Sequence, residues 1–93
     1  MAVVSGSPRE SVLKTLEYLG IRDLFPVVVG AEDYPRGKPA PDPFLIAANL
    51  LNVPPSECLV FEDADLGIES AIAAGMKWVR IAPPWERRLD RKW

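Results

Sequence analysis

The sequence contains no histidine and a single cysteine, Cys58, among its 93 residues. Without histidine the chain cannot form a His-ligated zinc site, a serine–histidine–aspartate triad or a histidine general base. A single cysteine excludes a framework of internal disulfides. Any metal ion that the protein binds must therefore be a hard cation that takes oxygen ligands.

The chain also lacks an excess of charge of one sign and any long apolar run. Its net charge is −2, and residues 1–46 (five basic, six acidic) and 47–93 (six basic, seven acidic) are balanced alike, which argues against a nucleic-acid-binding surface. No apolar run reaches the roughly 18 residues of a membrane span, and the N-terminus has no signal-peptide pattern. We therefore expect a cytoplasmic protein that binds neither nucleic acid nor membrane.

Apolar residues make up 48% of the chain and charged residues 26%, a composition typical of one small globular domain. Four continuous apolar or β-branched runs predict strands buried on both faces, and helical patterns lie between them. The predicted strands are residues 2–4, 25–29, 58–61 and 77–81. This alternation predicts an α/β fold with a mostly parallel sheet and helices on its faces. The domain would span residues 1–82, with 83–93 as a charged tail or short helix.

The predicted helices carry start and stop signals. Ser7 begins a capping-box pattern that ends at Glu10, with proline at the first helical position. Asp42 and Asp65 are the predicted N-caps of the second and third helices. The predicted stops are Gly20, residues 53–55 and Gly75.

A hydroxyl-rich turn, Ser5, Gly6 and Ser7, follows the first predicted strand and opens a helix. Two hydroxyls, a glycine that lets a ligand approach the backbone and the free N–H groups of a helix N-terminus can hold a phosphate. In the alternative interpretation Ser7 is only an N-cap and Ser5 only a turn residue.

The second polar cluster contains Lys38, which lies between Gly37 and Pro39 shortly before the second helix. A lysine held near a phosphate neutralises the negative charge that builds up in the transition state. The alternative is an ordinary solvated surface lysine.

The third cluster, Glu62, Asp63 and Asp65, follows an apolar run without any basic residue inside it. These carboxylates repel one another unless a cation lies between them, and Mg²⁺ binds to one or two carboxylates together with water and phosphate. We assign the metal to Glu62 and Asp63, with Asp65 as a helix cap. The alternative is that Glu62 and Asp63 simply face solvent.

These three clusters, in this order, resemble motifs of the haloacid dehalogenase-like hydrolases, in particular the sugar-phosphatase and β-phosphoglucomutase-like branch. The similar segments are residues 3–7 (V-V-S-G-S), 37–44 (G-K-P-A-P-D-P-F), 59–63 (L-V-F-E-D), 67–68 and 73–76, and the resemblance covers roughly residues 2–82. It implies a three-layer Rossmann-like core. It also implies that Ser5, with Gly6 and Ser7, binds the phosphoryl group of a small phosphorylated metabolite, that Lys38 acts in catalysis, and that Glu62 and Asp63 hold Mg²⁺.

The nucleophile motif of that family, D-x-D-G-T in a strand followed by a cap insertion, does not occur before Ser5. Asp63 and Asp65 form a D-x-D, but no Gly-Thr follows and the order relative to Lys38 is reversed, so we reject it as the nucleophile. In the family fold the nucleophile strand lies between the strands that correspond to residues 2–4 and 58–61. We expect those two strands to pair directly, a second copy or a partner chain to complete the sheet, or the truncated chain to be unstable alone.

Three functional hypotheses follow from the resemblance. The first is the C-terminal half of a Mg²⁺-dependent phosphatase of small phosphorylated metabolites, in particular sugar phosphates, that works through a phosphoaspartate and is inactive as this chain alone. The second is a fragment of a β-phosphoglucomutase-like phosphomutase. The third is a non-catalytic domain that binds phosphate and Mg²⁺ or pairs with a partner.

Overall fold

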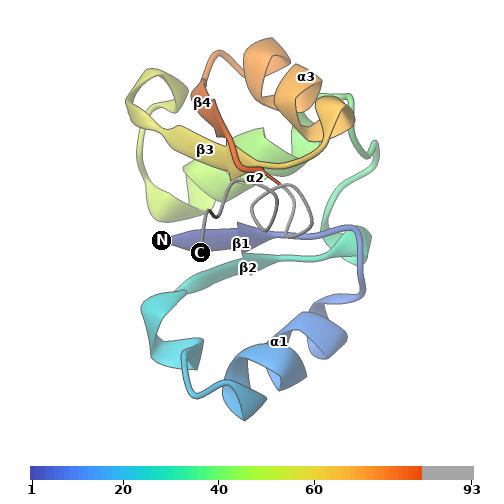
Figure 1. Cartoon of the computed structure of the whole chain (residues 1–93), viewed down its shortest axis with the longest axis vertical. Coiled ribbons are helices and arrows are strands. Elements are labelled where there is room, and N and C mark those ends of the chain that lie inside the picture. Colours follow the sequence, from blue (N-terminus) through green and yellow to red (C-terminus); the bar gives the residue numbers. More distant parts are fainter. Residues whose placement is uncertain (83–93) are drawn as a thin grey trace, which may run out of the picture.

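The structure, a computed structural model, describes residues 1–82, in which strands and α-helices alternate as the sequence predicts for an α/β fold (Figure 1). The strands are β1 (Ala2–Val4), β2 (Val27–Val29), β3 (Leu59–Glu62) and β4 (Lys77–Arg80). The helices are α1 (Arg9–Tyr18), α2 (Asp42–Leu51) and α3 (Asp65–Ala73), and short 3₁₀ helices span Arg22–Leu24, Ala31–Asp33 and Pro55–Glu57. The predicted tail, 83–93, lies outside the described residues.

The strands form two parallel two-stranded sheets. β1 pairs with β2 in a register that sets Val3 opposite Val28, and β3 pairs with β4 with Val60 opposite Trp78. The expectation that the strands at 2–4 and 58–61 pair directly is wrong, because no ladder joins β1 to β3. Each of these two strands therefore has one edge without a partner among residues 1–82.

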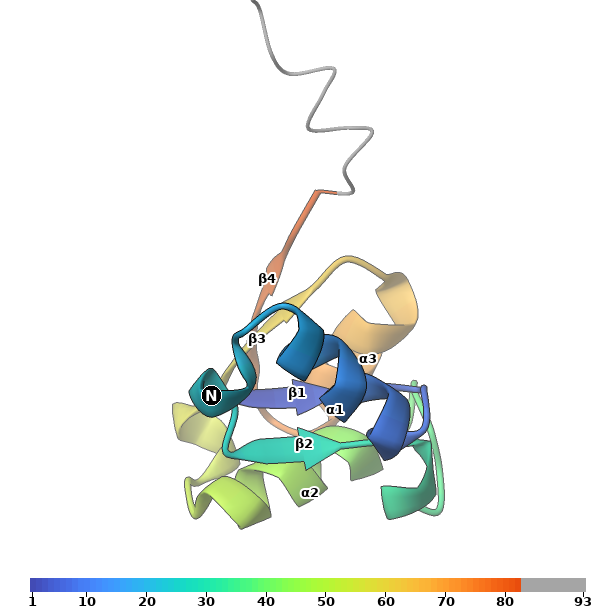
Figure 2. The same ribbon diagram turned by 90° about the horizontal axis from the view of Figure 1, so that it is seen from below.

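Helices cover both faces of the β1–β2 sheet. α1 packs against β2, and α2 packs against β1 and β2 from the opposite side (Figures 1 and 2). α3 contacts β3 and β4 and also touches α2. Val29 in β2 is completely buried as a result.

The main apolar core lies where α2 meets the second sheet. Phe44 and Ala48 of α2, Val60 of β3 and Ala71 of α3 are buried together with Met76. Small residues on α3 let that helix pack closely, because alanine leaves room for the backbone to approach. Burial of these side chains is the main favourable contribution to folding.

The second sheet contradicts the expectation that all four strands are buried on both faces. Leu59 and Phe61 of β3 are 52% and 62% exposed, and Trp78 and Val79 of β4 are also exposed. The prediction failed because continuous apolar runs are typical of central strands, whereas here each strand of this sheet is an edge strand.

The start of α1 also differs from the sequence-based expectation. Ser7 makes no side-chain capping bond, and the helix begins at Arg9, whose backbone N–H donates to the Glu32 carboxylate at 2.8 Å. The expected capping box is absent because this carboxylate from another loop satisfies the N–H group, while Glu10 forms an exposed ion pair with Lys14 at 3.4 Å. The acidic group at the N-terminus of α1 is thus Glu32, which comes from a distant loop and not from the helix itself.

Asp42 and Asp65 are the first residues of α2 and α3, one position inside the helices that they were expected to cap. Neither makes a capping bond, because each carboxylate pairs with a guanidinium group. Asp42 pairs with Arg36 at 3.0 Å, and Asp65 pairs with Arg80. Acidic residues in a first turn still interact favourably with the helix dipole.

The predicted stops of α1 and α3 are confirmed. Gly20 and Gly75 have φ angles of 72° and 75°, values that favour glycine. α2 ends instead at Asn52, with φ 59°, one residue before the expected stop, because asparagine tolerates the left-handed conformation. No helix within residues 1–82 is long and apolar enough to cross a membrane, and the cytoplasmic location stays a prediction.

Candidate active site

The loops that follow β1, β2 and β3 lie at one end of the molecule (Figure 1). Parallel pairing brings the carboxyl ends of β1 and β2 to the same edge of one sheet, and the contact between Lys38 and Glu62 joins that edge to the carboxyl end of β3. The loops carry the polar clusters that the sequence singles out: Ser5 to Ser7 after β1, Lys38 after β2, and Glu62 with Asp63 at the end of β3.

Lys38 and Glu62 are predicted site residues from two different clusters that the structure brings into direct contact. The Lys38 ammonium group donates to Glu62 Oε2 at 2.9 Å, and the two side chains are 28% and 12% exposed. The same ammonium lies 5.4 Å from the centroid of the Phe44 ring, within the range of a cation–π interaction. Lys38 is therefore held in place and is not a freely solvated lysine.

Glu62 is fully engaged by neighbouring donors. Its Oε1 accepts the backbone N–H groups of Asp63 and Ala64 at 3.1 and 3.2 Å, while Oε2 accepts Lys38. Burial acts to raise the pKa of Glu62, but the hydrogen bond from Lys38, the backbone donor and the ammonium charge outweigh it and lower the pKa below its ordinary value. Glu62 is ionised at neutral pH and orients Lys38.

Gly67 makes room for this carboxylate. A side chain placed on Gly67, in the first turn of α3, would overlap the Glu62 carboxyl group. Glycine is needed here for close approach of two elements, which explains the glycine of the motif at residues 67–68.

Ser70 is a site residue that the sequence reasoning missed. It is completely buried, and its Oγ donates to the Ala40 carbonyl at 2.5 Å, so that α3 anchors the loop that carries Lys38. The signal in the sequence was a serine next to the apolar positions Ile68 and Ala71. A buried hydroxyl requires a partner, but the sequence does not reveal which one.

The turn after β1 is stabilised by a hydrogen bond within the turn and by another from Tyr34. The Ser7 N–H donates to Ser5 Oγ at 3.0 Å, and Tyr34 Oη donates to the Ser5 carbonyl at 3.1 Å. Tyr34 belongs to the same loop as Lys38, so the first and second clusters are linked through it. Among the described residues no direct contact joins Ser5 to Lys38.

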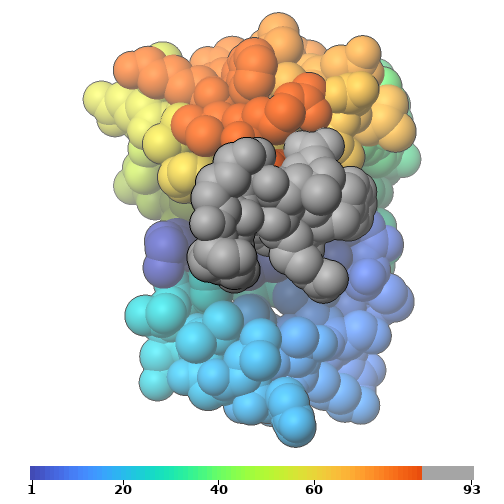
Figure 3. Space-filling model, in the orientation of Figure 1, coloured from blue at the N-terminus to red at the C-terminus, as the bar shows by residue number. Residues whose placement is uncertain are grey.

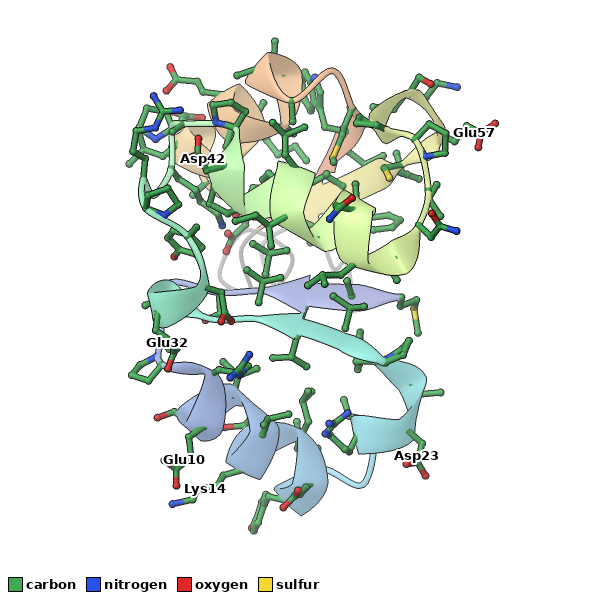
Figure 4. The ribbon with its side chains drawn as sticks, turned by 180° about the vertical axis from the view of Figure 1, so that it is seen from behind. Glu10, Lys14, Asp23, Glu32, Asp42 and Glu57 are labelled. Atoms are coloured by element: carbon green, nitrogen blue, oxygen red, sulfur yellow. The ribbon has the colours of Figure 1, made fainter. Side chains whose placement is uncertain are left out.

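The N-terminus of α1, expected to offer free N–H groups to a phosphate, is partly occupied. Glu32 accepts the Arg9 N–H, and the Arg9 guanidinium pairs with Asp33 at 3.2 Å. Figure 4 shows Glu32 on the turn beside the start of α1. The first helical N–H is therefore not free to bind a phosphate.

The acidic cluster offers one uncommitted carboxylate for a metal ion. Glu62 is occupied by Lys38 and backbone donors, and Asp65 pairs with Arg80. The Asp63 side chain is exposed and forms no ion pair with another described residue. Residues 1–82 contain no group of three acidic, histidine or cysteine side chains that could hold a metal. Asp63 fits the role of a single protein ligand to Mg²⁺, which commonly retains water and phosphate oxygens as its other ligands.

Parallel strands followed by a hydroxyl turn, a partly buried lysine and an acidic pair define an α/β protein whose strand ends carry groups of the kind that contact phosphoryl groups. Residues 1–75 match the family of haloacid dehalogenase-like hydrolases. The chain belongs to this family, and its fold is that of the Rossmann-like family core, truncated relative to its relatives.

Known proteins resemble this chain over most of its length. It is 47% identical over 81 residues to the fructose-1-phosphate phosphatase YqaB of Escherichia coli (87% of this chain, 43% of that protein). It is 44% identical over 82 residues to the chloroplastic 5-amino-6-(5-phospho-D-ribitylamino)uracil phosphatase of Arabidopsis thaliana (88% and 22%). Among solved structures, a putative β-phosphoglucomutase from Thermotoga maritima superposes with a TM-score of 0.74 at 31% identity (90% and 41%). The chain thus spans less than half the length of these relatives.

Proposed function

We propose that this chain supplies the phosphate-binding and metal-binding part of an enzyme that hydrolyses phosphate monoesters of small metabolites, in particular sugar phosphates. The observation that carries the proposal is the Lys38 ammonium held by Glu62, next to Asp63 in the sequence, at the carboxyl ends of parallel strands. The identity of 47% to a fructose-1-phosphate phosphatase supports the substrate class.

Each residue has a defined task in this proposal. The Ser5 hydroxyl binds phosphoryl oxygens, with the Gly6 N–H and the Ser7 hydroxyl nearby, while the Ser7 N–H stays bonded to Ser5 Oγ. Lys38 uses one of its three N–H donors on Glu62, which leaves donors for the phosphoryl group and neutralises charge there. Asp63 holds Mg²⁺. When bound, Mg²⁺ would offset the negative charge of the phosphoryl group.

The family resemblance implies that an aspartate oxygen forms a bond to phosphorus while the ester P–O bond breaks and the departing alcohol takes up a proton. Water then cleaves the phosphoaspartate and releases phosphate. The 93 residues contain no D-x-D-G-T segment. We therefore expect the lone chain to bind phosphate without turnover. Multiple turnovers of fructose 1-phosphate with Mg²⁺, abolished by Asp63→Ala, would contradict this expectation.

Binding of inorganic phosphate tests the site itself. We expect phosphate, titrated with Mg²⁺ present and followed by ³¹P NMR, to bind to the chain, and we expect Lys38→Met to weaken binding at least tenfold. Lys14→Met is the matched control, because Lys14 is an exposed lysine of α1 whose ion-pair partner among residues 1–82 is Glu10. Equal affinity of the Lys38 variant and the wild type would refute the proposed role of Lys38.

A phosphomutase is the second candidate, supported by the similarity to the putative β-phosphoglucomutase. A mutase transfers the phosphoryl group to a second position of the sugar, whereas a phosphatase releases inorganic phosphate. Product analysis with a complemented enzyme distinguishes them. A chain that binds phosphate but gains no activity on complementation would instead fit the non-catalytic hypothesis.

A further inference from the structure

Tyr34 connects two of the polar clusters of the candidate site. It follows the 3₁₀ helix Ala31–Asp33 and belongs to the same loop as Lys38. Its hydroxyl group donates to the Ser5 carbonyl, 29 residues earlier in the sequence, at 3.1 Å in a partly buried position. Tyr34 therefore reaches from the loop that carries the lysine to the turn that carries the hydroxyl groups.

The ring of Tyr34 also lies close to the base of the lysine turn. A side chain placed on Gly37 would lie 3.5 Å from the ring carbon Cε2, which is an ordinary van der Waals distance. The Gly37 carbonyl accepts the Ala40 N–H at 3.0 Å and so closes a turn that contains Lys38. The Tyr34 side chain thus lies next to both segments, with its ring beside Gly37 and its hydroxyl beside Ser5.

Backbone hydrogen bonds hold the turn after β1 against β2 and the residues that follow it. The Ser5 N–H donates to the Val29 carbonyl, and the Ala31 N–H donates to the Ser7 carbonyl, each at 2.9 Å. These bonds fix the turn relative to β2. The hydrogen bond from Tyr34 adds a contact from farther along the chain, so it fixes the turn relative to the loop that carries the lysine.

The loop of Tyr34 and Lys38 contacts both halves of the molecule. In the space-filling view, the half built from β1, β2 and α1 and the half built from β3, β4 and α3 are distinct (Figure 3). Tyr34 bonds to the first half at Ser5, and Lys38 bonds to the second half at Glu62, at 2.9 Å. Since no direct contact joins Ser5 to Lys38 within residues 1–82, the separation of these two groups depends on the loop and on both contacts.

We propose that Tyr34 is a positioning residue of the phosphate site, whose hydroxyl holds the Ser5 turn at the position in which one phosphoryl group contacts both Ser5 and Lys38. Ser5 Oγ accepts the Ser7 N–H at 3.0 Å, so the hydroxyl moves with the turn that Tyr34 holds. No atom lies within 4 Å of a side chain placed on Gly6, so a phosphate has room beside this turn. Two segments that are already held in place bind a ligand without the cost of ordering them. This role rests on the proposed function, in which both groups contact the same phosphoryl group.

A purely structural role of Tyr34 has different consequences. The loss of a hydrogen bond that only stabilises the fold lowers the free energy of unfolding, but the chains that remain folded bind phosphate as before. The loss of a positioning bond lowers the phosphate affinity of the folded chain, and does so only while the Ser5 hydroxyl is present. Tyr34→Phe separates the two roles, because it keeps the ring beside Gly37 and removes only the O–H group.

Phosphate titrations with Tyr34→Phe in the full chain test this role. With Mg²⁺ present and binding followed by ³¹P NMR, we expect the affinity for inorganic phosphate to fall about fivefold, within the range for the loss of one hydrogen bond. Tyr18→Phe is the matched control, because the second tyrosine of the chain is 91% exposed on α1. We expect this control to change the affinity less than about twofold. Equal affinity of Tyr34→Phe and the wild type would overturn the proposed positioning.

A double-mutant cycle with Ser5→Ala shows whether Tyr34 acts through the Ser5 hydroxyl. In the Ser5→Ala background, we expect Tyr34→Phe to weaken phosphate binding less than about twofold, since the group that it positions is absent. The same loss in both backgrounds would overturn the role, because independent effects add. Circular dichroism and urea denaturation of each variant confirm that the titrated chains are folded.

Amide hydrogen exchange without phosphate distinguishes a failure of this inference from a failure of the proposed function. If Tyr34 holds the turn, Tyr34→Phe accelerates exchange of the hydrogen-bonded Ser7 and Ala31 N–H groups at least about threefold, while amides within α2 keep their rates. Unchanged exchange at both positions would overturn the inference even if the wild type binds phosphate. A wild type that binds no phosphate would refute the proposed function, and accelerated exchange would then still support Tyr34 as the link between the turn and the lysine loop.

Discussion

The two sheets of this chain each consist of two short parallel strands, but their side chains are buried to different degrees. β1 and β2 lie between α1 and α2, and Val29 is completely buried. β3 and β4 expose Leu59, Phe61, Trp78 and Val79 and, unlike β1 and β2, also contain charged residues. An apolar run in the sequence therefore predicts a strand, but the helices and strands that pack against that strand decide whether its side chains are buried.

The largest expected effect on stability comes from comparing two phenylalanines, one buried and one exposed. Phe44 is buried where α2 meets β3, whereas Phe61 is 62% exposed. Phe44→Ala should lower the free energy of unfolding by about 4 kcal/mol, because it removes core contacts and leaves a cavity. Phe61→Ala should change it by less than about 0.5 kcal/mol. Urea denaturation followed by circular dichroism measures both, and a larger loss at Phe61 would show that the second sheet is closed in solution.

Gly67 tests how the end of the second sheet is joined to α3. Gly67→Ala should destabilise the chain by about 3 kcal/mol, since the new methyl group overlaps the Glu62 carboxylate and displaces it. Gly6→Ala is the control, because no atom lies within contact distance of a side chain there. Thermal unfolding compares the two variants, and equal stability would mean that Glu62 moves away without cost.

A substitution of Ser70 tests the hydrogen bond between α3 and the loop that follows β2. Ser70→Ala leaves the Ala40 carbonyl without its donor and should cost about 2 kcal/mol. We expect amide exchange of residues 37–40 to accelerate more than exchange within α2. Ser56→Ala, at an exposed serine, should leave both the stability and the exchange rates unchanged. If the Ser70 variant accelerates exchange uniformly, the serine acts on global stability alone.

The fold class and the positions of the elements could be predicted from local patterns, because continuous apolar runs and glycine stops are local signals. Gly20 and Gly75 end their helices as expected. The separation into two sheets could not be predicted with certainty, since strand pairing depends on which partner strands are present.

Residues of the candidate site were predictable in type but less so in arrangement. Lys38 and Glu62 were picked out separately, one for the substrate and one for the metal, yet the structure joins them 24 residues apart in the sequence as an ion pair. The sequence also did not indicate that Glu32 occupies the start of α1 or that Ser70 holds the lysine loop. Each of these contacts is tertiary, and no local pattern encodes its partner.

The smallest expected effect concerns the ion pair that connects the two sheets, since Lys38 follows β2 and Glu62 ends β3. The lowered pKa of Glu62 means that its contribution to stability is present above its unfolded pKa of about 4.3 and is lost as the pH falls through the lower folded value. Urea titrations between pH 7 and pH 3 should therefore show a smaller decline of the unfolding free energy for Glu62→Gln than for the wild type. At pH 7 the variant should be less stable by about 1 kcal/mol, because the partly exposed Lys38 limits the strength of the pair. Glu57→Gln, a change of an exposed carboxylate in the 3₁₀ helix that precedes β3, serves as the control. Parallel pH profiles for the wild type and Glu62→Gln would mean that the ion pair contributes nothing to holding the sheets together, and that the apolar contacts of α2 join them alone.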